Sequence, residues 1–298
     1  MTEKISRNVC KFNFLWEKGM STVEREIKIA MLSDIHWDNP HCDRVLLKAH
    51  LDYCLEQNIP IHVNGDFFCL MQGRGDPRRS KADVRPEHAN KANYIDAVIK
   101  DAVEWFKPYA PVLKLVSYGN HETGIIKHQE TDPLQRFVDL FNYETNAGVI
   151  IGGYGGWIWV DVHLNQTSKK TFKIKYFHGS GGGGIVTKGA INLTRALETY
   201  EGFDVFTIGH IHENWCRNDV RETLLTLNKF NGEIKQKELH LMVTGTYKDE
   251  YEDGYMGFHI EKGRPPKLTG GRILTVKMKR VDTKFYSMYD SYKFPLPW

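Results

Sequence analysis

Five short motifs of metal-binding residue types follow one another along the chain, each after a β-like run of residues. They are Asp34-Ile35-His36, Gly65-Asp66, Gly119-Asn120-His121-Glu122, His178-Gly179 and Gly209-His210-Ile211-His212. Residues two apart in a strand share a face, so Asp34 pairs with His36, and His210 pairs with His212, as chelating groups. Imidazole combined with carboxylate suits zinc, manganese or iron. Any single motif can arise by chance, but five in this order predict a metal centre.

The remaining histidines and the glycine-rich segments carry no comparable pattern. Eight histidines stand outside the five motifs and are interpreted as structural. The segment 179–184 is rich in glycine, but no Gly-Lys-Ser/Thr follows it, which excludes a P-loop. The segment 152–156 does not complete a GxGxxG fingerprint before a helix. The sequence therefore offers neither of these two nucleotide-binding motifs.

The first half of the chain alternates between strand and helix patterns, and the first three motifs lie where strands end. Apolar runs at 27–32, 59–63 and 112–116 predict strands. Between them, apolar residues recur at helical spacing over 45–55 and over 89–106. This βαβαβ order predicts an α/β core with parallel strands.

The second half of the chain has the pattern of antiparallel strands. Alternating residues at 157–162 and 172–176 predict two strands, and Asn231-Gly232 lies between two β-like stretches, which is typical of a hairpin. The segment 72–88 is rich in Gly, Pro, Arg and Asp and predicts a long loop after the second strand. We expect a single domain over 1–298, with a motif-bearing core at 27–214 and a β-rich, basic C-terminal extension at about 220–298.

Composition narrows the class of protein. The 298 residues are 41% hydrophobic and 26% charged, as in soluble globular proteins, and contain no run of about 20 apolar residues. Residues 1–13 lack the apolar core of a signal peptide. Five scattered cysteines without a CxxC pair favour free thiols over a disulfide framework. We therefore expect a cytoplasmic protein.

Charge is distributed unevenly along the chain. The formal net charge of +3 is too small to indicate a nucleic-acid partner by itself. The segment 261–298, however, has nine Lys or Arg against three acidic residues, a net charge of +6. This C-terminal segment suits an extended polyanion such as DNA or RNA.

In its five motifs the sequence resembles the calcineurin-like metallophosphoesterase family, over residues 27–214. The resemblance implies a four-layer α/β/β/α sandwich with mixed sheets and a two-metal centre at the C-terminal ends of the strands. One metal would be held by Asp34, His36 and His212, the second by Asn120, His178 and His210, with Asp66 bridging both. His121 matches the family's general acid, or the residue that orients the scissile phosphate.

The family's cofactors are two divalent metal ions, and the site's charges agree with that. Mn²⁺ is the expected metal, and Fe, Zn, Co and Ni are alternatives that the ligands tolerate. Two ions with Asp34 and Asp66 leave a charge of about +2, which attracts a phosphate ester. The resemblance implies hydrolysis by in-line attack of a hydroxide that bridges the two ions.

One position departs from the family pattern. Many members have an aspartate three residues after the bridging aspartate, and it orients the catalytic histidine; here that residue is Cys69. A thiol cannot supply a carboxylate, so either Glu122 or another acid orients His121, or His121 acts without one. The departure argues against a protein serine/threonine phosphatase and leaves metal binding unaffected.

The leading interpretation is a metal-dependent phosphoesterase, preferably a phosphodiesterase or nuclease that acts on nucleic acid or nucleotides. The loop at 72–88 carries Arg74, Arg78 and Arg79, which we expect to bind substrate phosphates. The alternatives are a small-molecule or protein phosphomonoesterase, and a non-catalytic binding module on the same fold. No membrane partner is expected, and the oligomeric state stays open.

Overall fold

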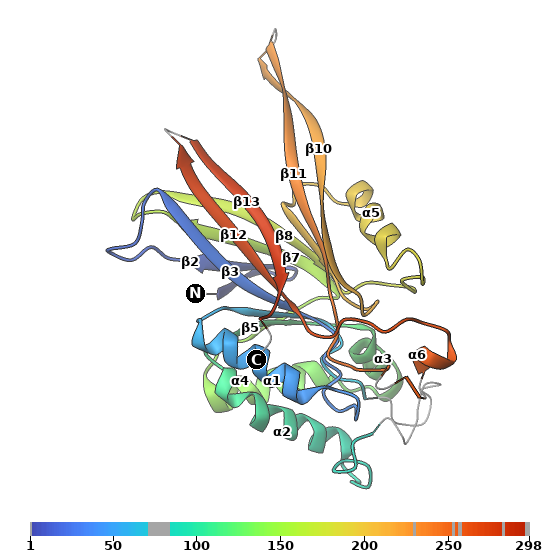
Figure 1. Cartoon of the computed structure of the whole chain (residues 1–298). Helices are drawn as coiled ribbons and strands as arrows, with labels where there is room; N and C mark the ends of the chain where they lie inside the picture. The colour runs from blue at the N-terminus through green and yellow to red at the C-terminus, as the bar shows by residue number, and fades with distance from the viewer. Residues whose placement is uncertain are drawn as a thin grey trace.

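The computed structural model arranges the chain as helices, a sheet, a second sheet and a further helix, stacked in that order (Figure 1). It describes residues 2–70, 84–228, 231–251, 254–255, 258–281 and 284–295. Buried apolar clusters join the helices to the first sheet, the two sheets to each other, and the second sheet to its helix. The predicted α/β/β/α sandwich with mixed sheets is confirmed.

The first sheet contains the strands that lead into the first three motifs. In spatial order its strands are β13 (Lys284–Lys293), β12 (Arg272–Val281), β3 (Glu24–Leu32), β4 (Ile61–Asn64), β5 (Leu113–Ser117) and β6 (Ile150–Gly152). The strands β3 to β6 are parallel, as predicted from the βαβαβ pattern, and β12 pairs antiparallel with β3. Its outer face is covered by α1 (Arg44–Glu56), α2 (Tyr94–Phe106) and α4 (Pro133–Thr145). Both faces are therefore buried, which is why these strands are almost continuously apolar.

The second sheet contains the strands that lead into the last two motifs. In spatial order they are β1 (Thr2–Ser6), β2 (Val9–Phe14), β7 (Gly155–His163), β8 (Lys169–Phe177), β9 (Val205–Ile208), β11 (Asn231–Thr244) and β10 (Asn214–Asn228). Its neighbours β7 and β8 are antiparallel, but β8, β9 and β11 are mutually parallel. The outer face packs against α5 (Ala190–Thr199). The remaining helices are α3 (Asn120–Gln129), η1 (Lys107–Tyr109) and α6 (Phe258–Glu261).

The structure corrects several of the expected elements. The helix predicted over 89–106 begins at Tyr94. Asn231 and Gly232 do not form the hairpin turn but lie within β11, where Gly232 pairs with Thr226. The N-terminal strands β1 and β2 and the helices α3, α4 and α5 were not predicted. The strand β2 pairs with its neighbour β1 and with β7, which lies far along the chain.

The strands β3, β4, β5, β8 and β9 all end at the same edge of the sandwich, which we call the motif edge. Two hairpins, β10–β11 and β12–β13, run from this edge toward the opposite end, which we call the far end (Figure 1). In the β3–β12 pairing, Arg272 lies opposite Met31 near the motif edge, and Lys279 lies opposite Glu24 near the far end. Among the described residues, no helix is long and apolar enough to cross a membrane.

Candidate metal centre

All seven residues predicted to bind metal lie at the motif edge, just past the ends of strands. They follow β3 (Asp34 and His36), β4 (Asp66), β5 (Asn120), β8 (His178) and β9 (His210 and His212). The carboxyl ends of the parallel strands point the same way, so residues far apart in the sequence meet there. The fold thus brings the five motifs together.

Asp34, His36 and His212 form the first ligand group. The Nε2 atom of His212 lies 3.3 Å from Oδ1 of Asp34 and 3.3 Å from Nε2 of His36. The Nε2 atom of His36 lies 4.0 Å from the same Asp34 oxygen. Two imidazole nitrogens and one carboxylate oxygen therefore converge on a single point.

Asp66, His178 and His210 form the second ligand group, and Asn120 joins it. The Oδ1 atom of Asn120 lies 3.1 Å from Nε2 of His178 and 2.7 Å from Nδ1 of His210. Oδ2 of Asp66 is 3.2 Å from Nε2 of His178 and 4.0 Å from Nε2 of His36 in the first group. Asp66 therefore lies between the two groups, where a bridging carboxylate would have to lie.

The ligand residues have an unusual backbone conformation. Asp34, His36, Asp66, His210 and His212 all have positive φ values, between 50° and 67°. Such a residue costs about 1–3 kcal/mol and persists only where its surroundings hold it. The paired residues of each motif therefore share a direction because of these left-handed turns, and not because they alternate along a strand as the sequence had indicated.

Hydrogen bonds between the motifs hold these turns in place. The backbone N–H of His36 donates to the carbonyl of Asp66 at 3.0 Å, and that of Asp34 donates to the carbonyl of Gly65 at 3.0 Å. The N–H of His210 donates to Oδ2 of Asp34 at 2.9 Å. Each motif is thereby fixed by its neighbour.

Gly119 and Gly65 allow the motifs to approach one another closely. A Cβ atom at Gly119 would lie 2.1 Å from Oδ1 of Asp66. Gly65 has a φ of +83°, and a Cβ atom there would lie 2.2 Å from Nδ1 of His178. Any larger residue would push a ligand side chain away from its group, so packing requires glycine at both positions, and the positive φ favours it at Gly65 as well.

Polar groups behind the ligands fix the direction of their rings. Nδ1 of His178 lies 2.8 Å from the carbonyl oxygen of Asn64, which places the proton on Nδ1 and turns Nε2 toward the ligand group. Nδ1 of His212 lies 3.7 Å from Oε2 of Glu250, an ion-pair distance. The Glu250 carboxylate also contacts Nε2 of His259 at 3.0 Å. Glu250 was missed in the sequence because it belongs to no motif and nears the site only through folding.

The protonation of the site reflects its burial and its carboxylates. Burial alone would lower the pKa of His178, but the Asp66 carboxylate raises it to about 10. Burial also opposes a proton on His212, but the nearby carboxylates of Asp34 and Glu250 raise its pKa to about 9. Burial would raise the pKa of Asp66, but His178, His121 and His36 together hold it well below its usual range. Two imidazolium groups therefore neutralise the carboxylates, and metal ions would displace these protons.

The donor atoms fit divalent metal ions. Among the described residues, the buried atoms Oδ1 of Asp34 and Nδ1 of His36 have no hydrogen-bond partner. Imidazole nitrogens, carboxylate oxygens and the amide oxygen of Asn120 are ligands that Mn²⁺, Fe²⁺ and Zn²⁺ accept. A buried, converging set of this kind is costly unless a cation compensates it.

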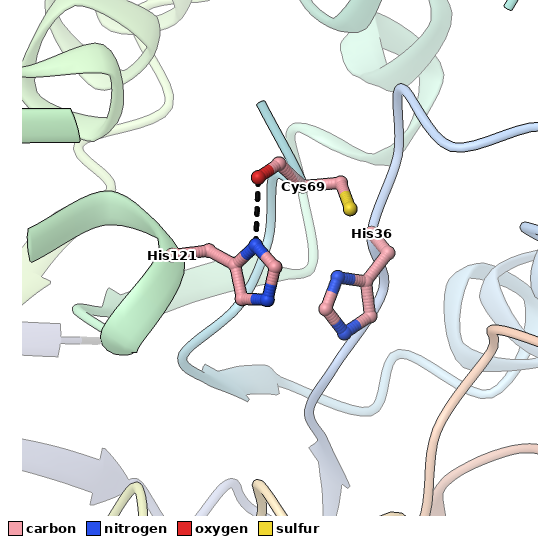
Figure 2. A group of neighbouring side chains, drawn as sticks. All are labelled: His36, Cys69 and His121. Carbon is pink, nitrogen blue, oxygen red and sulfur yellow. Dashed lines mark hydrogen bonds between the residues drawn. The ribbon is translucent and has the colours of Figure 1, made fainter. Parts of the chain in front are cut away.

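His121 lies beside both groups and is oriented by a backbone carbonyl. Its Nδ1 atom is 2.7 Å from the carbonyl oxygen of Cys69 and donates to it (Figure 2). Its Nε2 atom lies 3.9 Å from Oδ2 of Asp66, and its ring meets the ring of His36 edge-on at 4.8 Å. Of the three alternatives left open by Cys69, the contacts fit the last: among the described residues no acid contacts Nδ1, and the main-chain oxygen of Cys69 takes that place.

Glu122 has a different role from the one considered in the sequence. Its side chain is fully buried and accepts hydrogen bonds from the backbone N–H groups of Gly119, Phe68 and Asp66, at 2.8, 2.9 and 3.2 Å. Burial, followed by repulsion from Asp66, raises the pKa of Glu122 to about 8. Glu122 therefore joins two motifs through their backbones. The carbonyl of Cys69, and not Glu122, contacts Nδ1 of His121.

The remaining predictions for the site concern three arginines and the basic C-terminal segment. Arg74, Arg78 and Arg79 lie outside the described residues. In the basic C-terminal segment, Lys279 lies toward the far end, opposite Glu24. Lys267 does reach the motif edge, where its Nζ atom donates to the carbonyl of Ile211 at 2.7 Å. Its contribution is to hold the loop between His210 and His212.

Comparison with known proteins gives one family. The family model described as calcineurin-like phosphoesterase matches residues 27–214. No curated protein matches the sequence. Solved structures that match include vacuolar protein sorting 29 from Cryptosporidium parvum, which is 14% identical and covers 90% of this chain and 98% of that chain with a TM-score of 0.33.

Two further solved structures are similarly distant. A single mutant of Vps29 from Entamoeba histolytica is 12% identical and covers 90% of this chain and 100% of that chain, with a TM-score of 0.32. GAP50, described as the anchor in the inner membrane complex of Plasmodium, is 8% identical and covers 92% of this chain and 90% of that chain, with a TM-score of 0.38. At these scores the likeness carries no argument about function.

Proposed function

The chain belongs to the calcineurin-like phosphoesterase family, and from that premise we propose that it is an active hydrolase of phosphate diesters, with a polynucleotide as the substrate class. Mn²⁺ remains the metal that we expect. The proposal has three parts, which are catalysis, the preference for a diester and the polynucleotide, and each part rests on different residues.

The observation that best supports catalysis is the position of Asp66 between two groups of ligand atoms. One of its oxygens lies 3.2 Å from His178 in one group and 4.0 Å from His36 in the other. When bound, two divalent ions would supply a water molecule of lowered pKa and positive charge for the phosphate oxygens. The ligand residues would hold the ions in their deprotonated forms.

His121 supplies the group that could protonate a leaving oxygen. The carbonyl of Cys69 accepts from Nδ1, so the ring presents Nε2 toward Asp66 and the ligand groups. A proton on Nε2 of the imidazolium can be donated to the ester oxygen as the phosphorus–oxygen bond breaks. The side chain of His121 is 11% exposed, which is enough for a substrate to reach it.

The preference for a diester is supported by the residues around the ligand groups. The five motifs contain no arginine or lysine that would close around a terminal phosphate dianion. Among the described residues near the first group, Lys248 has its Nζ atom 2.5 Å from Oε1 of Glu250. Its charge is therefore shared with a carboxylate, whereas a diester with one negative charge needs less compensation.

The polynucleotide is supported by a basic groove beside the second ligand group. This groove has a volume of about 600 Å³ and lies between the N-terminal hairpin and the start of α3. Tyr118 and Thr123, which flank Asn120 and His121, line one side, and Lys4 and Arg7 line the other. Among the described residues, no acidic side chain lines it. A strand with its scissile phosphate at the ligand groups could place neighbouring phosphates in this groove.

A substrate comparison tests the proposal. The purified protein, loaded with Mn²⁺, is assayed on bis-4-nitrophenyl phosphate, on 4-nitrophenyl phosphate and on a single-stranded oligonucleotide. We expect the aryl diester to be cleaved faster than the monoester, and the oligonucleotide to be cleaved in a salt-sensitive manner. The His121→Asn variant is the matched control for contaminating nucleases.

Two outcomes would contradict the proposal in different ways. A clear preference for the monoester would replace the diesterase with a phosphomonoesterase. Absence of hydrolysis with Mn²⁺, Fe²⁺ and Zn²⁺, in protein shown by metal analysis to hold two ions, would favour the non-catalytic binding module.

A further inference from the structure

Asp38 is a buried carboxylate next to the ligand groups that belongs to neither of them. It is 0% exposed. Its Oδ1 atom accepts a hydrogen bond from the N–H of Cys69 at 2.6 Å, and its Oδ2 atom accepts one from the N–H of Leu70 at 2.8 Å. The hydroxyl of Tyr94, at the start of α2, also donates to Oδ2 at 2.8 Å. Asp38 therefore ties α2 to the segment that reaches His121.

The peptide unit between Cys69 and Leu70 links Asp38 to His121. A trans peptide is planar, and its N–H and C=O point in opposite directions. The N–H of this unit, on Leu70, donates to Asp38, while its C=O, on Cys69, accepts the proton of Nδ1 of His121 at 2.7 Å. Fixing the N–H toward Asp38 therefore fixes the carbonyl of Cys69 toward His121, and Figure 2 shows this carbonyl facing the ring.

The conformation of this segment needs such support. Leu70 has a φ of +46°, a left-handed conformation that is unfavourable for a residue with a branched side chain. The two backbone hydrogen bonds to Asp38 hold Cys69 and Leu70 in this arrangement. A hydrogen bond to a carboxylate also polarises the peptide, which makes its carbonyl a stronger acceptor for His121.

We propose that Asp38 is a positioning residue for His121 and acts on it through the peptide unit of Cys69 and Leu70. Tyr94 fixes Asp38, Asp38 fixes the peptide, and the peptide holds the proton of His121 on Nδ1 with Nε2 facing the substrate. This inference rests on the proposed role of His121 in ester hydrolysis. The thiol of Cys69 takes no part in it, because only its main chain is used.

The variant Asp38→Asn tests this role with little change in size. One amide oxygen can still accept from Cys69 or Leu70, but the amide nitrogen would face a backbone N–H. We expect the loaded enzyme to keep both metals and its KM, and to lose about tenfold in kcat, less than the 10²–10⁴ of a missing proton donor. The loss should be larger on an oligonucleotide than on bis-4-nitrophenyl phosphate, whose leaving group needs no proton.

A spectroscopic measurement separates positioning from general destabilisation. In Zn²⁺-loaded protein with ¹⁵N-labelled histidine, the Nδ1–H signal of His121 is identified by its loss in His121→Asn. We expect this signal in the wild type and its broadening or disappearance in Asp38→Asn. Tyr94→Phe, which removes one of the three hydrogen bonds, should weaken the signal and lower kcat about two- to threefold.

The matched control is Asp161→Asn, which alters another buried carboxylate. Asp161 is 0% exposed and accepts hydrogen bonds from Trp159 and Thr171 in the second sheet. This variant should lose stability but keep the His121 signal and the leaving-group dependence. If Asp38→Asn fails to fold, Tyr94→Phe with Tyr109→Phe as its control gives the same comparison, because the Tyr109 hydroxyl donates to Asp52 on the surface.

The inference is overturned if Asp38→Asn folds and keeps both the His121 Nδ1–H signal and the wild-type kcat, or if Asp161→Asn changes them equally. If Asp38→Asn does not fold, an unchanged signal and kcat in Tyr94→Phe overturn it. The proposed function fails separately. If the wild-type enzyme cleaves no ester, the histidine signal still reports whether Asp38 holds the ring.

Discussion

The motif edge and the far end of the sandwich differ in backbone conformation and in the burial of their charged residues. At the motif edge, ligand residues with positive φ values converge on two points, and most of their side chains are buried. At the far end, the β10–β11 and β12–β13 hairpins extend as ribbons (Figure 1). The strand β12 is buried from Arg272 to Val276 and exposed from Lys279 to Val281. At the motif edge each side chain has a defined, mostly buried position. At the far end the strands are exposed to solvent.

This difference shows that a basic segment in a sequence must be placed on the folded structure before it is assigned to a binding site. The segment 261–298 carries a net charge of +6, and it suggested a surface that suits an extended polyanion. Antiparallel pairing places Lys279 seven residues along β12 from Arg272, a distance of about 23 Å at about 3.3 Å per residue. The basic residues of one segment are thus spread along the length of a strand. The groove lined by Lys4 and Arg7 lies nearer the ligand groups than Lys279 does.

The largest expected effect is at Asp66, which lies between the two ligand groups. The variant Asp66→Asn keeps the shape but replaces a bridging carboxylate with a neutral amide. We expect metal content and activity to fall together, by more than the 10²–10⁴ that a missing proton donor costs. Metal analysis of the purified variant and its kcat on bis-4-nitrophenyl phosphate measure this. Full occupancy by two ions with wild-type turnover would contradict the two-metal arrangement.

The second prediction separates His121 from the ligands around it. The variant His121→Asn should retain both metals, because its ring belongs to neither of the two ligand groups that Asp66 joins, and should lose about 10²–10⁴ in kcat. The loss should be smaller for a 4-nitrophenol leaving group than for an alkyl one. Kinetics on matched aryl and alkyl diesters check this, and equal losses on both would argue against proton donation.

The convergence of the candidate metal ligands was largely predictable from the sequence, because these residues stand in short local motifs at strand ends. The directions of their side chains were not, since left-handed turns at residues such as Asp34 and His36 replace the expected strand alternation. The residues behind them, Asp38 and Glu250, lie outside any motif and reach the site only through tertiary structure. Their roles could not be found without the fold.

The elements divide in a similar way. Parallel strands with apolar runs were predicted because burial on both faces leaves a local pattern. The strands β1 and β2 were missed, although they form an antiparallel pair with each other; β2 joins the sheet by pairing with β7, far along the chain. The helix α4 did carry a local pattern: Asp132 caps it, Pro133 begins it, and Leu134, Phe137 and Phe141 form its buried stripe. That helix therefore has a local signal, whereas the placement of β2 beside β7 depends on tertiary structure.

The third prediction concerns acid sensitivity of the interior between the two ends. His62 in β4 is buried, and burial lowers its pKa to about 3. The unfolded chain binds the proton near pH 6.5, so stability is lost as the pH falls below 6.5 toward 3. Between pH 7.5 and 5.0 this histidine should lower the free energy of unfolding by about 2 kcal/mol. Urea unfolding of metal-stripped protein at both pH values, with His62→Gln alongside, measures its share; an equal pH dependence in the variant would exclude it.

The smallest expected effect compares the two basic surfaces directly. One double variant combines Lys4→Glu with Arg7→Glu in the groove, and its matched partner combines Lys279→Glu with Arg280→Glu at the far end. Both change the net charge equally, so a general electrostatic effect would weaken oligonucleotide binding in both. If the groove holds phosphates, the first variant should bind several-fold more weakly, and the slope of its salt dependence should fall by about 0.7 for each phosphate of the single strand that it no longer neutralises. The second should bind like the wild type, and the reverse result would move the polyanion surface to the far end.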